Sequence, residues 1–174
     1  MKKRFFCALL ALLLTAAPAM AEGGLIRALA TPEPLSAMFE SDGLRLTLPA
    51  GLVILEGSAL EGYEAAAQFD YPEAAHTILA AVDDQCTAAL IVAEAESDMD
   101  CLLAAQEAAE ALIGDPDAAS EADYGKNRAA GFACAIGEQS YRLYYLSDGA
   151  RLLIIGVSGL DEDVIEEMLT ELRF

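Results

Sequence analysis

The chain of 174 residues is poor in several residue types that common functions need. It has no tryptophan, one histidine and 10 basic side chains against 29 acidic ones, which gives a formal net charge of -19. A single lysine, Lys126, follows the first four residues. Such a surface lacks the basic footprint that neutralises phosphates, so we expect no nucleic-acid partner. With 55% hydrophobic and 22% charged residues, the composition also excludes collagen, a coiled coil and disorder.

Motifs for common catalytic chemistry are missing as well. A nucleophilic triad needs a base beside a serine or cysteine, and His76 is the only histidine. It lies in an expected strand with Ile78 and Ala80 on its side, which favours a core or edge histidine. There is no CxxC or Cys/His spacing for zinc, and no glycine-rich phosphate loop follows a strand. We therefore expect no cofactor, no metal and no enzymatic activity.

No apolar run reaches the roughly 20 residues that a membrane-spanning helix needs. The N-terminus instead has a cationic start at residues 2–4, an apolar run over residues 5–14 and a small-residue triplet at residues 19–21. This order predicts a secretory signal peptide over residues 1–21. Cleavage would remove three basic and no acidic residues, leaving a secreted or extracytoplasmic protein of net charge -22 with no stable membrane anchor.

Three cysteines, Cys86, Cys101 and Cys134, lie beyond the expected cleavage point. In an oxidising compartment, one disulfide plus one odd thiol is the first expectation. Strand and helix periodicity points all three toward apolar surroundings, so Cys101 could pair with either of the others. The alternative is three buried free thiols, which would be poor nucleophiles.

A chain of this size normally forms one domain. Residues 22–40 lack sustained periodicity and predict a flexible lead-in, and residues 41–174 predict a single domain. Alternating leucines predict a strand over residues 44–48, and two apolar runs joined by an acidic turn predict a hairpin over residues 76–93. Residues 58–71 carry conflicting helix and turn signals, so we assign them no element.

Two amphipathic helices are expected. The first is capped by Ser97 with Asp100 at the third helical position, and it ends at Gly114. The second is capped near Asp161. The apolar face of the first comprises Cys101, Leu102, Ala105, Ala108, Ala109, Leu112 and Ile113; that of the second comprises Val164, Ile165, Met168, Leu169 and Leu172.

Residues 120–157 predict a meander of antiparallel strands, with a hairpin turn at Asp148-Gly149. Because side chains alternate between the two faces of a sheet, the register follows from the turns. The expected core face comprises Phe132, Cys134, Ile136, Tyr141, Leu143, Tyr145, Leu152 and Ile154. The other face comprises Ala129, Gly131, Ala133, Arg142, Tyr144, Arg151 and Leu153.

Together these elements predict an α+β fold, in which two or three helices flank an antiparallel sheet as an α/β sandwich. The run Asp42-Gly43-Leu44-Arg45-Leu46-Thr47-Leu48-Pro49-Ala50-Gly51-Leu52, the late meander and the closing Glu171-Leu172-Arg173-Phe174 carry a resemblance. Over residues 41–174 the pattern resembles the PsbP/DcrB-like domains of exported bacterial and thylakoid-lumen proteins. The resemblance implies a domain that assists or binds other proteins, without shared catalytic residues.

The candidate binding residues come from an unusual placement of charge. Four of the seven cations left after cleavage fall within residues 126–151 of an otherwise acidic chain. Arg142, Tyr144 and Arg151 are expected on one sheet face, where they could receive a carboxylate ligand or an acidic partner segment. The alternative is that these cations pair with the protein's own acids.

The leading hypothesis is a non-enzymatic exported domain that binds or assists another extracytoplasmic protein. Two other classes stay open. One is a small hydrolase that uses carboxylates drawn together by folding, and the other is a small-molecule carrier with an apolar cavity between sheet and helix.

Overall fold

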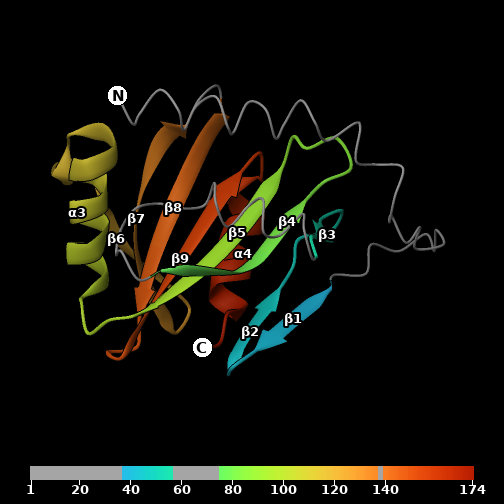
Figure 1. The fold of residues 1–174 in the computed structure, drawn as a ribbon, viewed down its shortest axis with the longest axis horizontal. Coiled ribbons are helices and arrows are strands. Elements are labelled where there is room, and N and C mark those ends of the chain that lie inside the picture. Colours follow the sequence, from blue (N-terminus) through green and yellow to red (C-terminus); the bar gives the residue numbers. More distant parts are fainter. Residues whose placement is uncertain (1–36, 57–74, 137–138) are drawn as a thin grey trace.

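The computed structural model describes residues 37–56, 75–136 and 139–174. A seven-stranded antiparallel sheet has the order β3-β4-β5-β9-β8-β7-β6, and β1 and β2 form a separate hairpin (Figure 1). The strands are β1 (Met38–Ser41), β2 (Leu44–Thr47), β3 (Val53–Ile54), β4 (His76–Val82), β5 (Ala89–Glu96), β6 (Ser120–Tyr124), β7 (Asn127–Ile136), β8 (Gln139–Ser147) and β9 (Arg151–Ser158). The helices are α3 (Cys101–Ile113), the 3-10 turn η1 (Pro116–Ala118) and α4 (Glu162–Glu171).

The expected α+β class is confirmed, with α3 on one face of the large sheet and α4 on the other (Figure 1). Strand β1 begins at Met38, so three residues of the expected lead-in 22–40 belong to a hairpin and the expected boundary at residue 41 is too late. The expected signal peptide and the unassigned residues 58–71 lie outside the described residues. Within the described ranges, no helix has the length and apolar character needed to cross a membrane.

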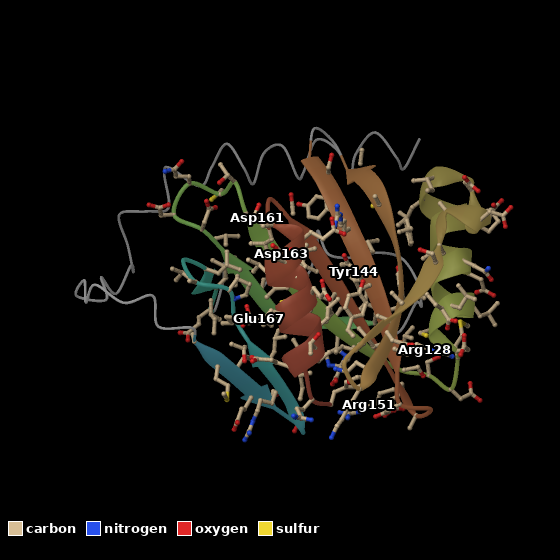
Figure 2. The ribbon with its side chains drawn as sticks, turned by 180° about the vertical axis from the view of Figure 1, so that it is seen from behind. Arg128, Tyr144, Arg151, Asp161, Asp163 and Glu167 are labelled. Atoms are coloured by element: carbon tan, nitrogen blue, oxygen red, sulfur yellow. The ribbon has the colours of Figure 1, made fainter. Side chains whose placement is uncertain are left out.

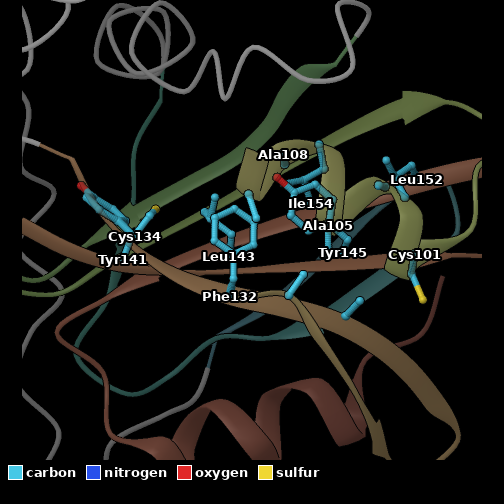
Figure 3. Packing of buried hydrophobic residues seen from close by; sticks show 14 of the residues in the cluster. Cys101, Ala105, Ala108, Phe132, Cys134, Tyr141, Leu143, Tyr145, Leu152 and Ile154 are labelled. Carbon is cyan, nitrogen blue, oxygen red and sulfur yellow. The ribbon is translucent and has the colours of Figure 1, made fainter. Parts of the chain in front are cut away.

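The face under α3 forms one hydrophobic core (Figure 3). The side chains expected there from strand alternation are buried: Phe132, Cys134, Tyr141, Leu143, Tyr145, Leu152 and Ile154. The side chain of Ile136 lies outside the described part of the chain. Alanines of α3 face these larger groups, because a small helical side chain lets the helix approach a sheet that carries aromatic residues.

The opposite face is a second core, whereas the sequence indicated only one. Leu153, Ile155 and Val157 of β9 and Tyr144 of β8 pack there with α4. The leucines of the β1–β2 hairpin and its extension, Leu44, Leu46 and Leu48, close this core at its open side, each at most 2% exposed. Alternation correctly separated the two faces, but burial of the second face depends on elements that arrive from distant parts of the chain.

Helix α3 begins later than expected. Asp100 is its N-cap, with a carboxylate that accepts from the Leu102 N–H at 2.9 Å, while the Ser97 hydroxyl accepts from the Met99 N–H in the preceding turn. The backbone of Ser97 still bonds to Ala150, so the chain is held in the sheet at that point and cannot yet turn into a helix. The helix ends at Gly114 in the left-handed conformation, as expected.

The two Asp-Gly pairs form different turns. Asp42 and Gly43 both have positive φ, 46° and 86°, as a type I′ hairpin requires. The turn expected at Asp148-Gly149 is shifted by one residue: the Asp148 N–H donates to the Arg151 carbonyl at 3.2 Å, so Gly149 and Ala150 are the central residues, and of these only Gly149 has positive φ. Here the Asp148 carboxylate accepts from the N–H groups of Ala150 and Arg151 at 2.9 and 2.7 Å.

Candidate functional site

Arg142 and Tyr144 lie two residues apart on β8, at the seam with α4. The guanidinium of Arg142 meets the Glu162 carboxylate through both terminal nitrogens, at 3.1 and 3.4 Å, and it also hydrogen bonds to Tyr144. The Tyr144 hydrogen bond and the Glu162 charge raise the pKa of Arg142. The fork that would receive a carboxylate ligand is thus occupied by a carboxylate of the protein itself.

Arg151 lies at the other end of the sheet, as its separation from Tyr144 in Figure 2 illustrates. It donates to Asp148 at 3.1 Å and to the Asp42 carbonyl at 3.0 Å. The register places Arg151 about six residues along the strand direction from Arg142, or about 20 Å. The structure therefore does not bring Arg142, Tyr144 and Arg151 into one site, and both arginines pair with the protein's own acids.

A cleft of about 550 Å³ lies where three turns meet. Its walls come from the start of α3, the β6–β7 turn, the β8–β9 turn and Phe174. Lys126 and Arg128 share the cleft with Asp98, Asp100 and Asp148. The N–H groups of Ala150 and Arg151 lower the pKa of Asp148, so this carboxyl stays ionised at neutral pH and is unsuited to donate a proton.

Beside this cleft, Asp100, Cys101 and Glu121 each offer one ligand atom, and the three atoms lie within 4.8 Å of one another. Each group already has a protein partner: Asp100 caps α3, and the Cys101 thiol contacts Glu121 at 3.5 Å. Burial, followed by the charges of Asp100 and Glu121, raises the pKa of Cys101 to about 11. The thiol is neutral at physiological pH and is a poor nucleophile.

The expected disulfide is absent: Cys86, Cys101 and Cys134 are all free thiols. Cys101 and Cys134 lie at opposite ends of the α3 core (Figure 3). Cys101 contacts Glu121, and Glu121 pairs with Ala130 of β7. Cys134 lies four residues further along β7, so its Cα is about 13 Å from that of Ala130, the β7 residue level with Cys101. This is beyond the roughly 7 Å that a disulfide can bridge.

Cys86 does not point into the core as strand alternation indicated. It lies in the β4–β5 turn with a φ of 55° and is half-buried. His76, at the start of β4, is an exposed edge residue whose Nε2 lies 3.5 Å from Glu94. This agrees with its interpretation as an edge histidine.

Helix α3 has exposed apolar side chains that helical periodicity predicted only in part. Among the described residues, five large hydrophobic side chains are exposed, and three of them belong to α3: Leu103 (48%), Leu112 (41%) and Ile113 (41%). Leu112 and Ile113 were expected in the core, but they occupy the last turn of the helix and remain partly open to solvent. Leu103 already lay outside the expected buried face, so its exposure was readable from the sequence. We call these three residues the α3 outer surface. Leu112 and Ile113 lie together in the last turn, whereas Leu103 lies on the opposite side of the helix from Leu112 and about 14 Å along its axis.

The fold defines an α+β sandwich with a helix on each face of an antiparallel sheet. No protein-family model matches the chain, and no curated protein matches it. A solved crystal structure of a protein from Bacteroides thetaiotaomicron is similar, with 14% sequence identity and a TM-score of 0.49. The match covers 78% of this chain and 47% of that chain.

Proposed function

We propose that this protein is an exported, non-enzymatic domain that binds or assists another extracytoplasmic protein. The observation that carries the proposal is the α3 outer surface, where Leu103, Leu112 and Ile113 are exposed on an otherwise acidic molecule. Leu112 and Ile113 are neighbours in the last turn of α3, and adjacent exposed apolar side chains are typical of protein-binding surfaces. The signal-peptide pattern of residues 1–21 supports export, and the resemblance of residues 41–174 to PsbP/DcrB-like domains supports an assisting role.

The packing of α3 explains why these side chains are available to a partner. The helix uses Ala104, Ala105, Ala108 and Ala109 to contact the sheet, each at most 1% exposed. Its larger side chains are therefore not needed to fill this core. Each of these side chains is already about half covered, so burying the rest of one contributes about 1 kcal/mol to the free energy of binding.

The charge of the protein narrows the kind of partner. With a net charge of -22 after cleavage, two copies of this chain repel each other over long range. A neutral or cationic partner meets no such repulsion. We therefore favour binding to a different protein over self-association.

Two alternatives have specific observations on their side. The hydrolase would use the carboxylates of the cleft, of which Asp148 is held ionised by its hydrogen bonds. The carrier would bind at the interface between α3 and the sheet, where the Tyr145 hydroxyl is buried and has no hydrogen-bond partner among the described residues. Turnover by the purified protein, or stoichiometric binding of a small molecule that shifts the Tyr145 ring resonances, would favour one of these over protein binding.

The test is recovery of a partner from an extracytoplasmic extract after chemical cross-linking, with tagged protein as bait. The variant Leu103→Gln/Leu112→Gln/Ile113→Gln should recover about tenfold less partner, because it loses the apolar area that the complex buries. The matched control Met38→Gln/Val53→Gln changes exposed apolar residues elsewhere and should recover as much as the native chain. Equal recovery with both variants would contradict the proposal.

A further inference from the structure

Strand β6 forms an open edge of the seven-stranded sheet. It is the last strand in the order, and among the described residues it pairs only with β7. Its first four residues, 120–123, are exposed. It follows α3 in the chain through η1 and contacts α3, so the open edge lies beside the helix that carries the proposed binding surface (Figure 1).

The hairpin geometry shows which backbone groups of β6 are free. Gly125, with a φ of 62°, and Lys126 form a two-residue turn, so Tyr124 and Asn127 are the hydrogen-bonded pair that closes the hairpin. Hydrogen-bonded pairs alternate with non-hydrogen-bonded pairs along an antiparallel ladder. The N–H and C=O groups of Glu121 and Asp123 therefore point away from β7. Nothing else in the described part of the chain forms a backbone hydrogen bond with them.

The side chains on this edge have a clear arrangement. Glu121 and Asp123 lie on the α3 side of the sheet, where Glu121 contacts Cys101 and Asp123 lies 3.5 Å from Arg128. Ala122 and Tyr124 lie on the other side, where Tyr124 packs edge-on against Tyr144 with ring centroids 6.1 Å apart. One side of the edge thus carries two acidic side chains beside the single Arg128 of β7, and the other side is apolar.

We propose that the β6 edge binds an extended segment of the partner protein in which basic and apolar residues alternate, so that the segment adds a strand to the sheet. The inference rests on the proposed function and specifies the partner's chemistry. Basic residues would lie opposite Glu121 and Asp123, at the roughly 5.5 Å Cα separation of a hydrogen-bonded pair. The apolar residue between them would lie beside Ala122, next to Tyr124.

Charge decides in favour of this occupant over a second copy of the chain. Pairing β6 with β6 in antiparallel register around Ala122 places Glu121 opposite Asp123, and like charges directly opposite one another are destabilising. Acidic residues on an edge strand guard it against indiscriminate pairing. Glu121 and Asp123 can pair with a strand that carries basic side chains, because the opposite charges attract.

The test uses the full chain and the peptide acetyl-Lys-Val-Lys-Val-Lys-amide, followed by amide hydrogen exchange and NMR. At saturation the Glu121 and Asp123 amides should exchange about tenfold more slowly, because only these outward groups gain a new hydrogen bond. The Ala122 and Tyr124 amides already bond to β7 and should change little. A Glu-Val-Glu-Val-Glu peptide should bind about tenfold more weakly. Absence of protection at Glu121 and Asp123 would overturn the proposal.

Backbone-modified peptides and one protein variant test the pairing itself. Methylation of the peptide nitrogens that face β6 should abolish binding, and methylation of the nitrogens that face away should not. Glu121→Pro removes an outward N–H without removing a bond to β7, and should weaken binding about tenfold more than the matched Glu121→Gln, which keeps the N–H. The methylated peptides act on the native protein, so they decide the question if the proline variant folds poorly.

These outcomes separate the inference from the proposed function. If Glu121→Pro leaves partner recovery unchanged while the α3 outer-surface variant abolishes it, the edge-strand inference fails and the proposed function stands. If Glu121→Pro abolishes partner recovery while the α3 outer-surface variant leaves it unchanged, α3 fails as the binding surface and the edge-strand inference stands. If neither variant affects recovery of a natural partner, both fail, even where the lysine peptide protects the edge. Loss of recovery with both variants supports both.

Discussion

Helices α3 and α4 cover opposite faces of one sheet, but they pack in different ways. Helix α3 presents alanines to a sheet face rich in aromatic residues, and Phe132 and Tyr145 stack there with ring centroids 6.3 Å apart. Helix α4 presents Ile165, Met168 and Leu169 to a mostly aliphatic face. The large side chains are thus on the sheet in one core and shared between sheet and helix in the other.

The ends of the two helices are also held differently. Helix α3 is capped by its own neighbours, Asp100 and Gly114. The end of α4 is held from a distance, because the Asn127 amide donates to the carbonyls of Leu169 and Leu172 at 2.7 and 2.9 Å. Helix α3 is thus specified locally and keeps three of its larger side chains exposed, whereas α4 depends on the rest of the fold.

The largest effect is expected from truncation of a large buried side chain of α4, which tests whether such side chains anchor the helix to the sheet. Leu169 is fully buried, so Leu169→Ala should lower the free energy of unfolding by about 3 kcal/mol through lost burial and the cavity left behind. Urea denaturation measures the change. The exposed neighbour Glu167→Ala should shift stability by no more than about 0.5 kcal/mol. A loss at Leu169 equal to that of the control would mean that α4 is not anchored as described.

The reverse change tests the α3 side. Ala105→Leu should destabilise the protein by about 1–3 kcal/mol, because Ala105 is fully buried and a larger side chain would push the helix off the sheet. Ala111→Leu makes the same substitution at an exposed position of α3 and should be nearly neutral. Tolerance of leucine at position 105 would show that α3 does not pack closely.

Two adjacent tyrosines on β8 sharpen the comparison further. Burial raises the pKa of Tyr145, and its hydroxyl has no partner in the α3 core. Tyr145→Phe should therefore stabilise the protein by about 1 kcal/mol. The Tyr144 hydroxyl, on the α4 side, hydrogen bonds to Arg142, so Tyr144→Phe should destabilise by about 1 kcal/mol. Parallel urea titrations measure both, and a loss of stability in Tyr145→Phe would mean that its hydroxyl is satisfied.

Features that depend on local spacing could be predicted from the sequence. Alternation with a period of two separates Leu143 from Tyr144, and Gly114 marks the end of α3. The late start of α3 could not be read, because Ser97 and Asp100 are both good caps and a backbone bond from Ser97 to Ala150 decides between them. Exposure of Leu112 depends on how far the sheet extends beneath the helix, which no local pattern encodes.

The candidate site was harder to predict than the fold. Arg142 and Arg151 share a sheet face as expected, but a face does not specify position along the strand. Nor does it reveal that Glu162, twenty residues further along the chain, supplies the partner of Arg142. The open β6 edge depends on the strand order, which becomes visible only when distant hairpins are assembled into one sheet.

The smallest predicted effect lies in the Asp148 turn, at the end of the sheet that both cores share. Hydrogen bonds from the Ala150 and Arg151 N–H groups, with a further contribution from the Arg151 side chain, lower the pKa of Asp148 below its ordinary value of 3.8. A carboxyl whose folded-state pKa is lowered contributes stability above its unfolded pKa and loses it as the pH falls through the folded pKa. The Asp148 side chain is 31% exposed, so solvent screening limits its contribution to about 0.5–1 kcal/mol.

Asp148→Asn keeps an acceptor oxygen and removes the charge. The difference in unfolding free energy between this variant and the native chain should be constant from pH 7 to about pH 5 and should shrink as the native carboxyl is protonated below about pH 4. Urea midpoints at each pH measure it. A difference that persists undiminished at pH 2 would assign the effect to geometry rather than charge. Among the residues that the structure describes, Asp148 shares no hydrogen-bond partner with Leu169 or Ala105, so its substitution should leave the changes in unfolding free energy caused by Leu169→Ala and Ala105→Leu unchanged.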